Sequence, residues 1–247
     1  GSSVYGADAV GGVVNFITRK EFDGAEVKAR QGFGDDYYST NASVTVGDNW
    51  GRTSGYLSYD YAQHDAIYGS DRGYAKDIDW STGVPRQRNC NPANVAIGVS
   101  EWTANADGTL TPGASACDTS ESATIYPDET RNSLLGGFRL DISDGLELNI
   151  KGWYSKRENT SDEGPINASA QVTSANPNYI STGGATGAST QTVGYNFAPV
   201  NGVHNDQDTT LEQWGFTPSL TWEIGHDWEM RAFYNYGYSE TEFSQSE

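Results

Sequence analysis

The stretch Val4–Lys20, VYGADAVGGVVNFITRK, is the one segment of the chain that is neither an amphipathic strand pattern nor a polar loop. A turn of small residues, YGADA, leads into Gly11-Gly12, where the absence of side chains lets the backbone turn or pack closely. The run VVNFI follows, and its β-branched and aromatic residues favour a short buried strand. The segment therefore predicts a packed junction, and the residues behind it must show what it joins.

Seven stretches behind this junction alternate apolar and polar residues with the period of two that indicates a half-buried strand. They cover residues 25–33, 38–46, 52–63, 130–142, 146–155, 214–224 and 228–238. Charged side chains stand in mid-strand, opposite the apolar face, at Lys28, Arg30, Arg139, Asp141, Glu147, Lys151 and Arg231. In a small sandwich such charges are solvated, whereas in a wide barrel they face a wet lumen or a polar plug.

The connections between these strands differ in length in a regular way. After a first short turn, tight turns at 48–51, 143–145 and 225–227 alternate with two long polar stretches, 64–129 and 156–208. All long connections therefore fall at one end of the strands. This is typical of an outer-membrane barrel with short periplasmic turns and long external loops, and a soluble sandwich has no reason to adopt it.

Aromatic residues gather toward both ends of the predicted strands. Those near the long loops are Tyr56, Tyr59, Tyr61, Trp153, Tyr154, Trp214 and Phe216, and those near the short turns are Trp50, Trp222 and Trp228. Two such belts fit the two interfaces of a membrane. The alternative is that tyrosine and tryptophan simply favour strands.

Composition narrows the class of protein. The formal net charge is −18, which argues against nucleic acid as a partner, because phosphate binding needs a basic patch. No run of eighteen apolar residues is present, so no transmembrane helix is predicted, although a spanning strand needs only about 9–11 residues. An aromatic content of 12% and 29 glycines suit a β protein with long polar loops.

The two cysteines, Cys90 and Cys117, lie in the same long polar stretch. No CxxC motif or histidine pair accompanies them, so a zinc site is not expected. We predict a loop disulfide, with two free thiols as the alternative. A disulfide implies an oxidising compartment.

The sequence carries no recognisable catalytic constellation. It contains no GxGxxG, GxxxxGK[ST], HExxH or GxSxG motif, and its three histidines are dispersed. We therefore expect no enzyme, no cofactor and no metal centre. The pairs Asp77/Asp79 and Asp206/Asp208 leave a calcium site open as an alternative, because hard oxygen ligands cluster in this way.

From Tyr5 to Arg19 the chain resembles the end of the plug domain of TonB-dependent outer-membrane receptors. In that family a Tyr-Gly-small-Asp-Ala-apolar-Gly-Gly-Val-apolar-Asn-apolar-apolar-Thr pattern leads from the plug into the barrel. The positions that match are Tyr5, Gly6, Asp8, Gly11, Gly12 and Asn15, and the resemblance implies that they are structural. It divides the chain into the C-terminal end of a plug domain, residues 1–22, and the N-terminal part of a transmembrane antiparallel up-and-down β-barrel, residues 23–247.

The resemblance also implies a function. Such receptors sit in the bacterial outer membrane, bind a scarce ligand of the iron–siderophore, cobalamin or oligosaccharide class, and import it actively. Their partners are the outer-membrane lipid, the ligand and the TonB complex, which pulls on an N-terminal box that is absent from this chain. The alternative is a secreted soluble β protein, an adhesin or a glycan-binding module.

Two further expectations concern the loops and the extent of the barrel. We expect 64–129 and 156–208 to form an external vestibule with ligand-contacting residues at Tyr68, Tyr74, Trp80, Trp102, Tyr126, Tyr179 and Tyr195. Seven strands is an odd number, no signal peptide precedes GSSVYGADA, and plug-filled transporters have about 22 strands. We therefore expect an internal piece of a larger receptor.

Overall fold

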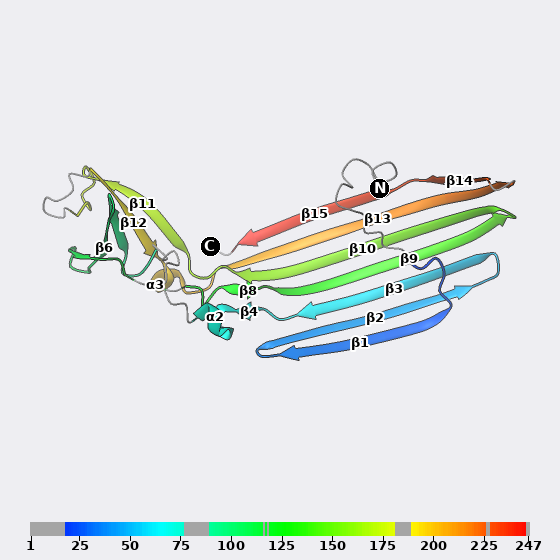
Figure 1. Cartoon of the computed structure of the whole chain (residues 1–247), viewed down its shortest axis with the longest axis horizontal. Helices are drawn as coiled ribbons and strands as arrows, with labels where there is room; N and C mark the ends of the chain where they lie inside the picture. Colours follow the sequence, from blue (N-terminus) through cyan, green and yellow to red (C-terminus); the bar gives the residue numbers. More distant parts are fainter. Residues whose placement is uncertain are drawn as a thin grey trace.

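The computed structural model describes residues 18–76, 89–115, 117, 119–180, 189–225 and 228–245. The chain is all-β, with 67% strand and 5% helix, and its sheets are antiparallel. A long sheet forms most of the molecule, and a smaller sheet lies beyond one end of it (Figure 1).

The long sheet contains eight strands. They are β1 (Gly24–Gly34), β2 (Tyr37–Asn49), β3 (Thr53–His64), β9 (Asp128–Ser143), β10 (Leu146–Asp162), β13 (Asp206–Gly225), β14 (Trp228–Phe233) and β15 (Tyr236–Gln245). Because β14 and β15 pair with successive parts of β13, the eight strands occupy seven positions in the order of the sequence. They correspond to the seven predicted stretches, with the last one interrupted after Phe233. The described strands form an open sheet and not a closed barrel.

The pairing register places apolar side chains of all seven positions in continuous rows. One row runs through Val27, Val44, Tyr59, Leu134, Tyr154, Trp214 and Tyr238. We call this side of the sheet the apolar face. Although its residues are large, six of the seven in this row are exposed, from 76% at Val27 to 38% at Trp214, and Tyr154 is half-buried. The opposite side, which carries Lys28, Arg139 and Lys151, is called the polar face.

The small sheet holds the tightest packing in the described ranges. Its strands, in the order β11-β12-β5-β6-β7, are β5 (Asn94–Ile97), β6 (Ser100–Ala104), β7 (Leu110–Pro112), β11 (Asn167–Thr173) and β12 (Thr190–Asn196). The largest fully buried side chains of the described chain, Ile97, Val95 and Cys90, all belong to it or border it. The long sheet therefore has no apolar core of its own.

The disulfide joins Cys90 to Cys117, with their Cα atoms 5.7 Å apart. Cys90 is fully buried and forms a bridge with Tyr195 of β12. The bond therefore ties the segment before β5 to the segment after β7, within the small sheet. This is the loop disulfide that the sequence analysis preferred to two free thiols.

The two long connections are more ordered than the sequence analysis expected. Beyond the small sheet they contain the ribbon β4 (Ile67–Tyr68) and β8 (Thr124–Tyr126), and the helices η1 (Gly69–Asp71), α2 (Gly73–Lys76) and α3 (Ala198–Asn201). These strands are short and pair across long sequence separations, so they leave no periodic pattern. In the described ranges no helix is long and apolar enough to cross a membrane.

The bounds of the connections also differ from the prediction. β9 begins at Asp128, β10 continues to Asp162 and β13 begins at Asp206, so the second long connection is 163–205 rather than 156–208. The reason is that the backbone ladder extends beyond the apolar face, into residues that are polar on both sides. Alternation ends there although the strands do not.

Candidate functional site

Residues 18–23, which we call the crossing segment, run over the polar face before β1 begins. The Tyr56 hydroxyl of β3 donates a hydrogen bond to the Arg19 carbonyl at 3.0 Å. The Lys151 ammonium of β10 donates to the Thr18 hydroxyl. The crossing segment is therefore fastened to two strands that lie far from it in the sequence.

Arg139 of β9 is the charged centre of this attachment. Its guanidinium contacts Glu147 at 2.8 Å, Asp141 at 2.9 Å and the Glu21 carboxylate of the crossing segment. The Arg139 side chain is only 27% exposed. Hydrogen bonds between charged groups are shorter and stronger than neutral ones, so this cluster is a substantial link between the crossing segment and the sheet.

Two glycines make room for the crossing segment and for Tyr56. A Cβ atom at Gly137 would collide with the Tyr56 ring, which lies directly across from it in the β3–β9 pair. A Cβ atom at Gly47 would collide with the Phe22 carbonyl oxygen. Glycine is needed at both positions because the backbone or a ring approaches so closely.

This arrangement corrects the predicted aromatic belt at two positions. Tyr56 lies near the short-turn end of β3 and not near the long loops, is only 8% exposed, and reaches the crossing segment on the polar face. Trp153 lies on the same face, where its ring would be 3.0 Å from a Cβ atom at Gly215. Both residues are adjacent in sequence to apolar-face positions, and the pleat turns them to the opposite side.

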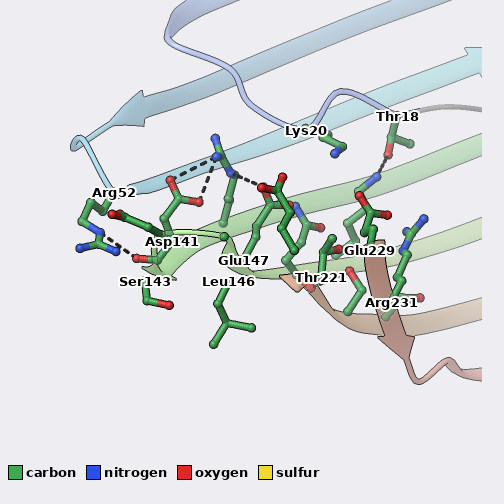
Figure 2. Close-up of a pocket in the computed structure, with 18 residues that line it drawn as sticks. Thr18, Lys20, Arg52, Asp141, Ser143, Leu146, Glu147, Thr221, Glu229 and Arg231 are labelled. Atoms are coloured by element: carbon green, nitrogen blue, oxygen red, sulfur yellow. Dashed lines mark hydrogen bonds and ion pairs between the residues drawn. The ribbon is translucent and has the colours of Figure 1, made fainter. Parts of the chain in front are cut away.

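A hollow of about 830 Å³ lies beside the Arg139 cluster, at the short-turn end of the polar face (Figure 2). The crossing segment contributes Thr18 and Lys20 to its lining. The other charged side chains of the lining are Arg52, Arg139, Lys151, Arg231, Asp141, Asp144, Glu147, Glu223 and Glu229. With Lys20 these make five basic and five acidic groups, so neither sign of charge dominates. A mixed polar lining suits a salt-bridged protein segment better than an apolar ligand.

Tyr5, Gly6, Asp8, Gly11, Gly12 and Asn15 lie outside the described residues, as does Trp80. The described chain begins at Thr18, within three residues of the last matching position.

The other predicted ligand-contacting residues do not converge on one site. Tyr68 and Tyr126 belong to the ribbon β4–β8, where Tyr126 stacks on His64 with ring centroids 4.5 Å apart. Trp102 and Tyr195 lie on β6 and β12 of the small sheet, and Tyr195 packs edge-on against Phe197. The remaining two are Tyr74, which is 74% exposed on α2, and Tyr179, which is half-buried.

Asp162 anchors the second long connection at the end of β10. Its carboxylate is 2% exposed and accepts hydrogen bonds from the Gly164 and Asn205 amides, at 2.8 and 3.0 Å, and from His204. Burial on its own raises the pKa of Asp162, but the Asn205, His204 and Gly164 hydrogen bonds together bring the pKa below its usual value. This residue has no local sequence signal, because His204 and Asn205, two of the three partners of its carboxylate, lie 42 and 43 residues away.

The same end of the sheet is rich in acidic groups. Burial first, and then the charges of Asp162, Asp206, Asp128 and Asp71, raise the pKa of the Tyr68 hydroxyl. Even so, the described ranges contain no group of three or more histidine, cysteine, aspartate or glutamate side chains placed to hold a metal ion. The calcium alternative thus gains no support at Asp206/Asp208, and Asp77/Asp79 lie outside the described residues.

Comparisons with models of known protein families, with curated proteins and with solved structures found no match to this chain.

Proposed function

We propose that the chain forms the junction between plug and barrel, and the adjoining barrel wall, of a TonB-dependent outer-membrane receptor that imports a scarce ligand. The observation that carries the proposal is the continuous apolar face of an up-and-down antiparallel sheet whose long connections all lie at one end. Soluble monomers rarely expose an apolar patch that spans a whole sheet.

The extent of the apolar face supports a membrane-spanning wall. On β10 and β13 it runs from Leu146 to Tyr154 and from Trp222 to Trp214, which are paired row by row. Each stretch is nine residues long, and a spanning strand needs about 9–11. The row Tyr59, Tyr154, Trp214 and Tyr238 then lies at one interface, and Trp222 and Trp228 lie at the other.

The proposal also requires both edges of the sheet to be covered. In lipid an unpaired strand edge is costly, because no water is present to satisfy its backbone groups. β1 forms one edge of the described sheet, and β14 and β15 together form the other. We propose that further strands of the same barrel pair with them.

The crossing segment fits the place where a plug enters its barrel. It lies on the polar face, which in this proposal lines the lumen, and Glu21, Thr18 and Arg19 bind to the wall. Ligand import requires the plug to rearrange while the barrel stays intact. The Arg139 cluster is then the fixed end against which the rearrangement takes place.

Spin labels on β3 test the proposal directly. Cys90 and Cys117 are bonded to each other and are the only two cysteines of the chain, so one introduced cysteine gives one labelled site. Labels at residues 55–61, one at a time, are placed in protein reconstituted in lipid vesicles. We expect accessibility to oxygen, which partitions into lipid, at Leu57 and Tyr59, and accessibility to a water-soluble nickel chelate at Ser58 and Asp60.

The soluble adhesin or glycan-binding alternative gives a different pattern. Its two faces would both meet water, so the nickel chelate would reach Leu57 as readily as Ser58. That outcome, or a protein that stays soluble without detergent or lipid, would overturn the proposed function.

A further inference from the structure

Three arginines lie in a single row on the polar face, toward the long-connection end. The row runs through Arg30, Asn41, Ala62, Arg131, Arg157, Leu211 and Thr241. It contains no acidic residue, although the whole chain has a formal net charge of −18. Three of the 15 lysines and arginines of the chain therefore share one row.

Arg131 of β9 and Arg157 of β10 are direct partners in this row. Side chains that face each other across strands have Cβ atoms about 4.5–5.5 Å apart, and like charges so placed destabilise the pair. Arg157 has one carboxylate nearby, Glu129 at 3.8 Å, and is 44% exposed. Arg131 is exposed and has no ion-pair partner among the described residues. The two positive charges of the arginine pair are therefore only partly balanced by nearby carboxylates.

The next row on the same face supplies two neutral donors beside one carboxylate, Asp60, which is the cross-strand partner of Ser133. The Ser133 and Ser155 hydroxyls are 3.3 Å apart and are adjacent to the arginine pair, two residues along β9 and β10. On the other side of the arginine pair, Glu129 is the cross-strand partner of His64, whose ring is stacked on Tyr126. Guanidinium forks and hydroxyls together are the groups that bind oxyanions, since each fork matches one carboxylate or phosphate.

We propose that Arg131 and Arg157 bind a small molecule that carries at least two carboxylate or phosphate groups. The inference rests on the proposed function, which places the site on the luminal wall below the external connections. It narrows the class of imported ligand to a multivalent oxyanion. The ligand relieves the repulsion between the two guanidinium groups. Neutral oligosaccharides lack the charge that this pair requires.

The test is calorimetric titration of the protein, in an uncharged detergent, with citrate, with pyrophosphate and with maltotriose. Ionic strength is held constant so that screening does not differ between the ligands. We expect citrate or pyrophosphate to bind and maltotriose not to bind. Tighter binding of citrate would indicate a carboxylate ligand, and tighter binding of pyrophosphate a phosphate ligand. Arg131→Gln is expected to weaken binding about tenfold, the usual effect of losing one hydrogen bond to a charged group.

The controls separate binding from structure. Arg231→Gln removes the same charge from the same face at the short-turn end, and it should leave the affinity unchanged. Arg131→Gln should leave the unfolding midpoint unchanged or raise it, because it removes a like-charge contact, and Arg131→Lys should retain part of the binding. The proposal is overturned if neither oxyanion binds, if Arg131→Gln binds as well as the original protein, or if Arg131→Gln lowers the unfolding midpoint.

Failure of the two proposals can be told apart. Spin labels that report no contact with lipid would overturn the receptor, whatever citrate and pyrophosphate do. Conversely, lipid contact at Leu57 without any oxyanion binding would leave the receptor in place and remove this ligand class.

Discussion

At the scale of the residue, Arg139 shows how a single cation can hold a segment in place. Three carboxylates converge on it, and two of them, Asp141 and Glu147, come from the sheet itself. The third, Glu21, belongs to the crossing segment. Without the guanidinium these carboxylates would repel one another, so the arginine adds an ionic link to the hydrogen bonds from Tyr56 and Lys151 that also hold the crossing segment.

Replacing Arg139 by glutamine should therefore release the crossing segment. We expect the free energy of unfolding to fall by about 1–2 kcal/mol, since hydrogen bonds to charged groups contribute about 1.5–3 kcal/mol and the side chain is partly exposed. Amide hydrogen exchange should become faster in residues 18–23, and urea unfolding should show the loss of stability. Arg231→Gln is the matched control, because Arg231 lines the same hollow and has no ion-pair partner in the described ranges. Equal exchange rates in the two variants would contradict the role of Arg139.

At the scale of the element, the small sheet depends on its disulfide. β5, β6 and β7 have four, five and three residues, and their buried apolar side chains are few. Such short strands lose conformational entropy on folding and gain little from burial in return. The bond between Cys90 and Cys117 limits that loss by constraining the unfolded chain.

Replacing Cys90 and Cys117 by alanine should loosen the small sheet selectively. The two cysteines are 27 residues apart, and a loop of this length corresponds to about 3–4 kcal/mol of stabilisation in the chain-entropy model. We expect amide exchange to become faster at Val95 and Ile97, with no change at Leu148 in the long sheet. Unchanged protection at Val95 and Ile97 would show that packing alone holds these strands.

The strands also differ in whether they could be predicted from the sequence. Alternation revealed the long sheet except for the break that separates β14 from β15 and the extension of β15 to Gln245, because one face is apolar and the other is polar over many residues. It missed β5 and β12, because NVAI is too short for a pattern and TQTVGYN is buried only where it meets a distant partner.

Less of the candidate site than of the fold could be predicted from the sequence. The contacts of Glu21 with Arg139, and the pairing of Arg131 with Arg157, depend on register and on a path across the sheet. No local motif contains both partners. The positions of the individual charges on the polar face could be predicted, but their neighbours could not.

At the scale of the whole molecule, the distribution of apolar surface is the decisive property. The long sheet buries no large apolar side chain fully, while residues such as Phe138, Ile150 and Trp222 are 37–45% exposed along one face. A sheet of this kind gains little hydrophobic stabilisation in water. In a membrane the same face contacts the lipid chains and needs no second layer of protein. The cost of a charged substitution on this face should then depend on its depth in the bilayer.

Arginine substitutions along β10 measure that dependence. Ile150 lies midway between Leu146 and Tyr154, which end the apolar stretch. For protein folded in lipid vesicles, we expect Ile150→Arg to cost about 2–4 kcal/mol and Tyr154→Arg about 0–1 kcal/mol, because the cost of a charge falls from the midplane toward the interface. Ser58→Arg places the same charge on the polar face, across from Thr45 and Leu135 and away from the arginine pair, and serves as the control. In a soluble protein Ile150 would be an ordinary exposed position, so equal unfolding free energies for Ile150→Arg and Ser58→Arg would exclude a lipid-facing wall.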